Sequence, residues 1–199
     1  LLDKKIYQHI KVMKNNIPNC RIEVVTNGDP LNKDRLLKLF ESGLDKILIS
    51  VYDGEKEYNE FSDMILKSGL SEEKYILRKR YFSEEMDFGI TLSNRAGLME
   101  NAEYKIPKLE KPMEKLCYIP SYTLFFDYLG DVLMCPHDWG KKIILGNLYK
   151  EKLLDIWFNE RSLKIRKQLG SKNRNFSPCN VCDVEGTLMG KTNTEYFLK

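Results

Sequence analysis

Four of the five cysteines in this chain occur at spacings that suit a metal centre. Cys117 is followed after twelve residues by Gly130 and after four more by Cys135, and Cys179 and Cys182 form a C-x2-C pair further along. Two residues between cysteines let neighbouring thiolates bind one ion or one cluster. The chain has only two histidines, so a site with four protein ligands must rely on sulfur. Because zinc and iron–sulfur clusters both accept four thiolates, the spacing leaves both open.

An alternative without a metal also fits these residues. Cys117 and Cys135 would then be buried apolar side chains, and Cys179 and Cys182 would form a redox pair. The fifth cysteine, Cys20, stands alone before a predicted strand and is expected to pack in the core, as free cysteines often do.

A predicted hairpin explains how the first two cysteines of the pattern come together. Residues 122–128 and 131–135 have the composition of strands, and Gly130 between them reverses the chain at little steric cost. Cys117 and Cys135 are therefore expected at the same edge of a small module.

An amphipathic helix is predicted after the hairpin, over residues 152–169. The basic residues along this helix and just after it are expected to form a solvated face, since charged runs on helices usually do; they are Arg161, Lys164, Arg166, Lys167 and Lys172.

The first half of the chain repeats a pattern of helix, turn and strand. Strands are predicted at 21–26, 46–51, 75–79 and 88–93, and helices over 1–14, from Asn32 or Asp34 through Phe40, and over 56–67. The strand starts lie about 25 residues apart, the length of one βα unit, and continuous apolar runs suit parallel strands covered on both faces. The fold class predicted is α/β, with parallel strands that belong to a partial (β/α) barrel.

The composition indicates an ordinary globular protein. Of 199 residues, 42% are hydrophobic and 31% charged, and 32 basic residues against 29 acidic ones give a net charge of +3. This balance indicates neither a nucleic-acid groove nor a membrane surface, and no apolar run approaches the roughly 20 residues of a membrane helix. With no signal-peptide pattern, the cysteines indicate a reducing compartment, so we expect a cytoplasmic protein. The chain starts within a helical pattern and without Met, so a fragment or a processed product is expected.

In its cysteine pattern and in several short segments, the chain resembles the carboxy-terminal part of a radical S-adenosylmethionine enzyme that ends in a Twitch module. The Twitch module is the shortened relative of the SPASM domain. The cysteine pattern of that module, C-x(9–15)-G-x4-C followed by C-x2-C, is met in full by the residues given above. Further similar segments are Thr26-Asn27-Gly28, Ile49 to Asp53, Asn94-Arg95-Ala96-Gly97, Gly146-Asn147-Leu148 and Leu154 to Trp157. The Asn94 segment is similar to one found in members related to 2-deoxy-scyllo-inosamine dehydrogenase.

The resemblance implies a domain organisation and a cofactor. It implies a partial barrel over 1–97, a connector over 98–112, a small α+β Twitch or SPASM-type iron–sulfur module over 113–185, and a tail over 186–199. The four patterned cysteines would bind one auxiliary [4Fe-4S] cluster. A second auxiliary cluster is not expected, because Leu188 and Thr192 occupy the positions of its cysteines.

Two polar residues are candidates for binding S-adenosylmethionine. The resemblance puts Ser50, at the end of a predicted strand, against the ribose or carboxylate of this cofactor; a strand-terminal cap is the alternative. Arg95 also follows a strand, where its guanidinium could pair with the cofactor carboxylate or a substrate hydroxyl, or else form a surface salt bridge.

The chain lacks the C-x3-C-x2-C motif with which the family generates radicals, and the Gly-Gly-Glu segment that follows in the family. S-adenosylmethionine and a second [4Fe-4S] cluster are therefore expected only in a full-length parent, and this chain alone is expected to be inactive. The parent would be a dehydrogenase or other modifier of a sugar-like substrate; a peptide substrate and an electron donor or acceptor protein are further expected partners. The alternatives are a non-catalytic module with structural zinc and a degenerate barrel that binds a peptide.

Overall fold

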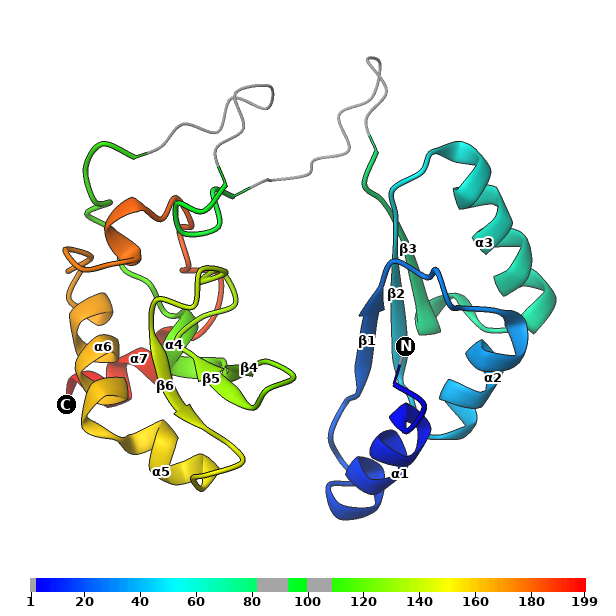
Figure 1. Ribbon diagram of the computed structural model, residues 1–199, viewed down its shortest axis with the longest axis horizontal. Coiled ribbons are helices and arrows are strands. Elements are labelled where there is room, and N and C mark those ends of the chain that lie inside the picture. The colour runs from blue at the N-terminus through cyan, green and yellow to red at the C-terminus, as the bar shows by residue number, and fades with distance from the viewer. Residues whose placement is uncertain (1–2, 82–92, 100–108) are drawn as a thin grey trace. The chain divides into compact units, whose positions relative to one another are not determined.

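The computed structural model describes residues 3–81, 93–99 and 109–199. The chain divides into two compact units, Leu1–Ile90 and Thr91–Lys199 (Figure 1). The elements of the first unit are α1 Ile6–Asn16, β1 Glu23–Thr26, α2 Lys33–Glu41, β2 Lys46–Val51, α3 Glu55–Ser68, η1 Glu72–Lys74 and β3 Tyr75–Lys79.

The first unit is a parallel sheet with its helices packed on one face. The strand order is β1-β2-β3, and both neighbouring pairs are parallel. This confirms the predicted parallel strands; the fourth expected strand reaches into 82–92, outside the described residues. Alternate residues of β2, Ile47, Ile49 and Val51, are buried in a core with side chains of α1, α2 and α3. Since strand side chains alternate between faces, Leu48 and Ser50 point to the other side of the sheet.

Local sequence signals set the limits of the helices in this unit. The Asn32 side chain accepts a hydrogen bond from the Arg35 N–H at 2.9 Å and so caps the start of α2. Gly69 ends α3 in the left-handed conformation, with φ +72°. The loop between β2 and α3 is closed by Glu57, whose carboxylate accepts the N–H groups of Tyr52 and Asp53, both at 3.0 Å.

The packing of the first unit predicts that replacing two helical leucines by alanine has different effects on the free energy of unfolding. Leu36 is fully buried, whereas Leu66 is 80% exposed. Leu36→Ala is expected to lower the free energy of unfolding by about 2–5 kcal/mol, because it leaves a cavity, and Leu66→Ala by less than about 0.5 kcal/mol. Urea unfolding followed by far-UV circular dichroism measures both. Because both tryptophans, Trp139 and Trp157, lie in the second unit, their fluorescence reports separately on that unit; equal losses for the two leucines would contradict the described packing.

The second unit combines a small antiparallel sheet with helices. Its elements are α4 Ile119–Tyr122, β4 Phe125–Phe126, β5 Asp131–Leu133, β6 Ile144–Asn147, α5 Leu153–Phe158, α6 Glu160–Gly170, η2 Cys179–Val181 and α7 Lys191–Leu198. The strand order is β4-β5-β6, with β4 and β5 antiparallel across Gly130, which confirms the predicted hairpin.

The single helix predicted over 152–169 is wrong, because the chain forms two helices there. Asn159 is extended, with φ −63° and ψ 158°, and its side chain accepts a hydrogen bond from the Ser162 N–H at 2.8 Å. Its Nδ2 atom donates to the Leu145 carbonyl at 2.9 Å. Asn159 therefore caps α6, and the contact with Leu145, which neighbours it only in the folded unit, favours the break.

The expected solvated face of this helix is also wrong at one position. Arg166 is 2% exposed, and its guanidinium lies 3.8 Å from the Trp157 ring centre and 4.6 Å from that of Phe197 in α7. Residues 186–199, expected as a tail, thus include a helix that helps to bury Arg166. Among the described residues, no helix is long and apolar enough to cross a membrane.

Candidate metal centre

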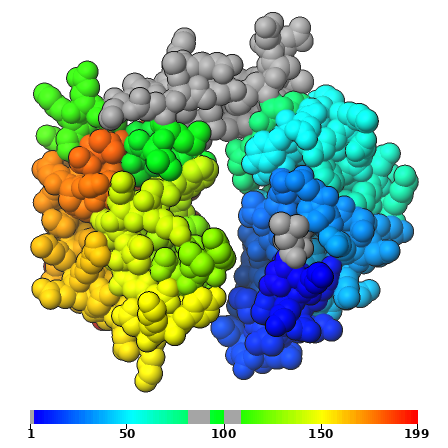
Figure 2. Space-filling model, viewed as in Figure 1, coloured from blue at the N-terminus to red at the C-terminus, as the bar shows by residue number. Residues whose placement is uncertain are grey.

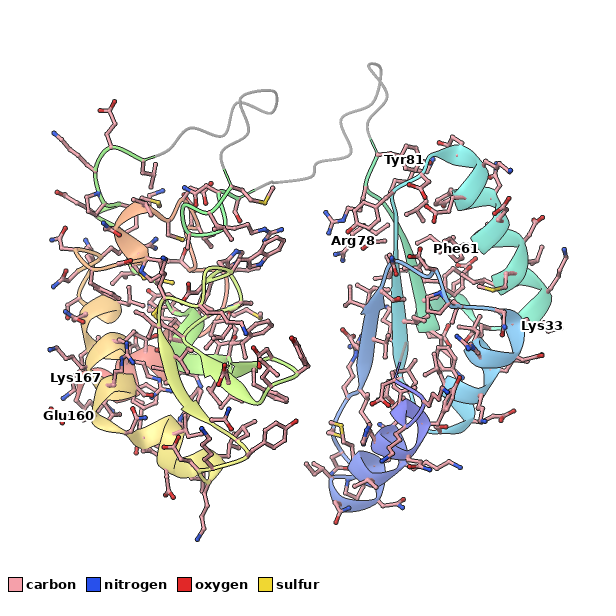
Figure 3. All side chains as sticks on the ribbon, viewed as in Figure 1. Lys33, Phe61, Arg78, Tyr81, Glu160 and Lys167 are labelled. Atoms are coloured by element: carbon pink, nitrogen blue, oxygen red, sulfur yellow. The ribbon has the colours of Figure 1, made fainter. Side chains whose placement is uncertain are left out.

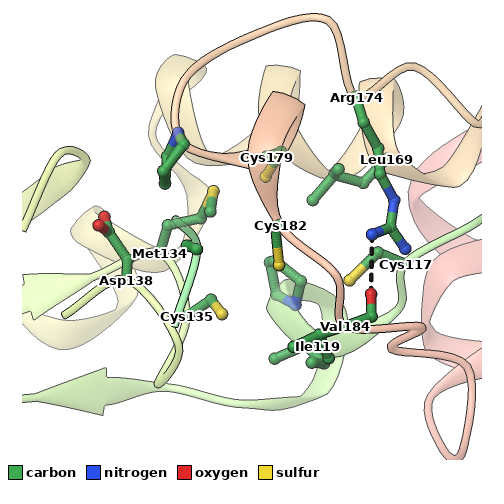
Figure 4. A pocket seen from close by; sticks show the side chains of 13 residues that line it. Cys117, Ile119, Met134, Cys135, Asp138, Leu169, Arg174, Cys179, Cys182 and Val184 are labelled. Atoms are coloured by element: carbon green, nitrogen blue, oxygen red, sulfur yellow. Dashed lines mark hydrogen bonds between the residues drawn. The ribbon is translucent and has the colours of Figure 1, made fainter. Parts of the chain in front are cut away.

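Three separate segments of the second unit bring the four patterned cysteines to one cavity. Cys117 precedes α4, and its N–H donates to the Leu169 carbonyl at 3.3 Å. Cys135 follows β5, so the hairpin delivers it, and Cys179 and Cys182 lie in and directly after η2. All four line one cavity, which encloses about 370 Å³ of space including its open mouth. Figure 4 shows their sulfur atoms facing that space.

The four thiols lie in an apolar environment. Burial raises the pKa of Cys135 to about 12, and also raises the pKa of Cys117, Cys179 and Cys182. The His137 N–H donates to Cys135 Sγ at 3.2 Å, which partly opposes the effect of burial. All five cysteines of the chain are free thiols. A metal would have to displace the protons of these thiols on binding, as it does at other thiolate sites.

The spacing of the ligands distinguishes a single ion from a cluster. Sulfurs that share one zinc ion, at Zn–S distances of about 2.3 Å, lie about 3.8 Å apart. Within residues 3–81, 93–99 and 109–199, no group of three or more His, Cys, Asp or Glu side chains has the spacing that holds a metal ion. The four sulfurs thus line one cavity, and among the described residues they do not form a group with the spacing of a single-ion site.

A glycine keeps this space open next to Cys117. Gly186 has φ +69°, and its carbonyl accepts the Tyr118 N–H at 2.8 Å. A Cβ atom at this position would lie 2.5 Å from Cys117 Sγ, closer than real Cβ contacts allow. The absence of a side chain at Gly186 therefore leaves Cys117 free to face the cavity.

An arginine that sequence reasoning missed also lines the cavity. Arg174 is 2% exposed, and it donates to the carbonyl oxygens of Lys115, Leu116, Val184 and Glu185 at 2.7–2.9 Å. These carbonyls lie just before Cys117 and just after Cys182, so Arg174 ties the two cysteine segments together. A lone Arg in a loop gives no periodic signal, and only its acceptors in the folded unit reveal its role.

The segment Asn94–Gly97 packs on the second unit, against the C-x2-C pair. The Asn94 N–H donates to Asp183 Oδ2 at 2.8 Å, and its side chain donates to the Val181 carbonyl at 2.6 Å. Gly97 approaches Val181 so closely that a Cβ atom would lie 2.5 Å from Val181 Cγ2. In Figure 2 the green residues of this segment adjoin orange residues near the C-x2-C pair. The segment assigned to the barrel on the sequence thus makes its contacts in the second unit.

Arg95 shares these surroundings. Its backbone is left-handed, with φ +48°, and its guanidinium lies 4.7 Å from the ring centre of Trp139. Its Nη1 atom is 3.5 Å from Nδ1 of His137. Burial lowers the pKa of His137, and the charge of Arg95 lowers it further. The described contacts of the Arg95 side chain are therefore with residues that follow Cys135.

Ser50 lies in the first unit, next to Arg78. It is buried near the carboxyl end of β2, and its register partner in β3 is Arg78. Figure 3 shows Arg78 on the side of the sheet away from Phe61 of α3. Ser50 and Arg78 therefore share the sheet face that does not pack on the helices. The remaining cysteine, Cys20, packs against the core of this unit, as expected.

Comparisons with known proteins agree with this arrangement. Residues 117–183 match the SPASM family, an iron–sulfur cluster-binding domain. The chain is 30% identical, over 185 residues, to the S-adenosyl-L-methionine-dependent 2-deoxy-scyllo-inosamine dehydrogenase of Niallia circulans, covering 92% of this chain and 68% of that protein.

Solved structures give the same relationship. The crystal structure of BtrN in complex with AdoMet and 2-DOIA is 27% identical with a TM-score of 0.74, covering 98% of this chain and 71% of BtrN. A selenomethionine structure of BtrN in an open conformation, aligned at 22% identity with a TM-score of 0.63 over 91% of this chain and 65% of that one, shares the fold. The chain therefore belongs to the radical S-adenosylmethionine family of 2-deoxy-scyllo-inosamine dehydrogenase and carries a SPASM iron–sulfur domain.

Proposed function

We propose that the second unit is a Twitch-type module in which Cys117, Cys135, Cys179 and Cys182 bind one auxiliary [4Fe-4S] cluster. The observation that carries this proposal is that four thiols line one cavity, those of Cys135, Cys179 and Cys182 buried and that of Cys117 half-buried, and that among the described residues no group has single-ion spacing. When bound, such a cluster exchanges single electrons, and four thiolate ligands leave no iron open to a substrate.

The residues around the cavity give it a protected environment. Apart from Arg174 and Asp138 its lining is largely apolar, with Ile119, Met134, Leu169 and Val184 among the cysteines. These side chains exclude water from the cluster, and burial and solvent exclusion are among the factors that tune cluster potentials. The module accordingly serves electron transfer or holds the substrate, and it does not itself cleave a bond.

The first unit contributes to a site for S-adenosylmethionine in this proposal. Its parallel sheet would be part of a (β/α) barrel, whose ligands bind at the carboxyl ends of the strands. Ser50 can hydrogen-bond the ribose or the carboxylate of the cofactor, and Arg78 beside it offers a guanidinium that suits a carboxylate. For Arg95 we keep a cofactor carboxylate or a substrate hydroxyl as the proposed partner of its guanidinium.

The substrate follows from the relatives and is part of the proposal. By analogy with the 2-deoxy-scyllo-inosamine dehydrogenase, we infer a hydroxyl-rich, sugar-like substrate that is oxidised, and an electron donor or acceptor protein as a partner. The C-x3-C-x2-C motif is not present in these 199 residues, so this chain by itself would not cleave S-adenosylmethionine.

The metal content of the chain tests the proposal. Anaerobic reconstitution of the full chain with iron and sulfide is expected to give about four irons and four sulfides per chain, because a [4Fe-4S] cluster requires them. Metal and sulfide analysis together with the absorbance spectrum measure this. Stoichiometric zinc without sulfide, retained after competition with iron, would instead identify a structural zinc module.

A further inference from the structure

A buried cation, Arg174, lies beside the cysteine cavity. In the part of the chain that the structure describes, no ion pair includes Arg174. Its hydrogen bonds go to four backbone carbonyls and, at 4.0 Å, to Met113 Sδ, which carry only partial negative charge. Burying a charge is costly unless other groups compensate it. A hydrogen bond from Lys115 and, to a smaller degree, the charge of Arg174 lower the pKa of the exposed Glu185 carboxyl, and Asp138 lines the same cavity. Neither carboxylate forms a described ion pair with Arg174, so its positive charge is only partly balanced.

We propose that Arg174 sets the reduction potential of the auxiliary cluster by holding a fixed positive charge at its thiolates. This inference rests on the proposed function, since it needs the cluster to be bound at the four cysteines. Four thiolates bring four negative charges into a buried cavity, and reduction of the cluster adds one more electron. A nearby cation stabilises the more negative, reduced state, so it raises the reduction potential.

The position of Arg174 is suited to this role. It lines the cavity together with all four cysteines, and Figure 4 shows its guanidinium beside Cys117. The bonds to Lys115, Leu116, Val184 and Glu185 come from both cysteine segments and keep the guanidinium in place, and a guanidinium keeps its charge in proteins.

The chain offers a matched control in a second buried arginine. Arg166 is also 2% exposed and also donates to backbone carbonyls, those of Pro120 and Trp157. Burial lowers its pKa to about 10, so it too is charged at neutral pH. Arg166 does not line the cysteine cavity; it borders a separate one with Ile156 and Trp157. Replacing Arg166 therefore removes a buried positive charge from the same module but leaves the positive charge at the cysteine cavity in place.

A redox titration of the reconstituted full chain tests the inference. Cluster reduction is followed by electron paramagnetic resonance as dithionite and mediators supply one electron, and no bond or proton changes are required. Arg174→Met is expected to make reduction about tenfold less favourable, a potential about 59 mV more negative for a one-electron couple. Arg174→Lys, which keeps the charge, and Arg166→Met are expected to stay near the potential of the unaltered chain.

Each other outcome decides between the alternatives. If Arg174→Met loses the cluster while Arg174→Lys keeps it at the original potential, the inference is supported, because a positive charge at position 174 is then sufficient for the cluster and its potential. An unchanged potential in Arg174→Met overturns the inference, and so does loss of the cluster in both variants, because the hydrogen-bonding geometry would then be decisive. Failure of the unaltered chain to bind iron and sulfide would refute the proposed function itself, which is a different result.

Discussion

The double variant Cys179→Ala/Cys182→Ala is expected to bind almost no iron after anaerobic reconstitution, whereas the unaltered chain binds about four atoms. The variant retains only Cys117 and Cys135 at the cavity, and two thiolates are too few to hold a cubane against loss to solvent. Iron and sulfide analysis measures the loss, and the absorbance spectrum shows whether any cluster remains. Single replacements of any of the four cysteines are expected to lower the iron content as well, because each removes one thiolate from the ligand set.

Cys20→Ala is the matched control for this variant. Cys20 packs against the core of the first unit, so its replacement is expected to leave about four irons in place. Fluorescence of Trp139 and Trp157 checks that the double variant keeps its second unit folded. If the double variant bound as much iron as the unaltered chain, the metal would lie elsewhere and the assignment of these cysteines would be wrong.

Gly186→Ala is expected to have the second largest effect on the metal centre. The added Cβ would lie 2.5 Å from Cys117 Sγ, so either the thiol or the loop must move. The left-handed backbone, with φ +69°, adds strain of about 1–2 kcal/mol for any residue other than glycine. We expect the variant to lose more than half of its iron, because a displaced Cys117 no longer completes the ligand set.

Gly69→Ala separates backbone strain from crowding. Gly69 has a similar φ of +72°, but no atom lies within 4 Å of the position of an added Cβ. This variant is expected to lose about 1–2 kcal/mol of unfolding free energy and none of its iron. Equal iron content in the two variants would show that Cys117 does not depend on the space at Gly186.

The sequence alone predicted those parts of the fold whose signals are local. The parallel strands of the first unit follow from continuous, largely apolar runs such as Ile47 to Val51. The start of α2 follows from Asn32, whose side chain accepts the N–H of the residue three positions later. The hairpin followed from Gly130 between two strand-like segments. In each of these cases the residues that determine the element are close together in the sequence or belong to one repeating pattern.

For the site, the sequence alone predicted the four candidate ligands and the family, because cysteine spacing and short motifs are properties of the chain itself. That Cys117, Cys135 and the C-x2-C pair face one cavity was decided by the folded unit, since the three segments meet only through packing. The break at Asn159, the burial of Arg166 and the position of Arg174 likewise depend on partners far along the chain. A side chain is bound by whichever acceptors surround it after folding, and these distant acceptors are what a one-dimensional pattern does not contain.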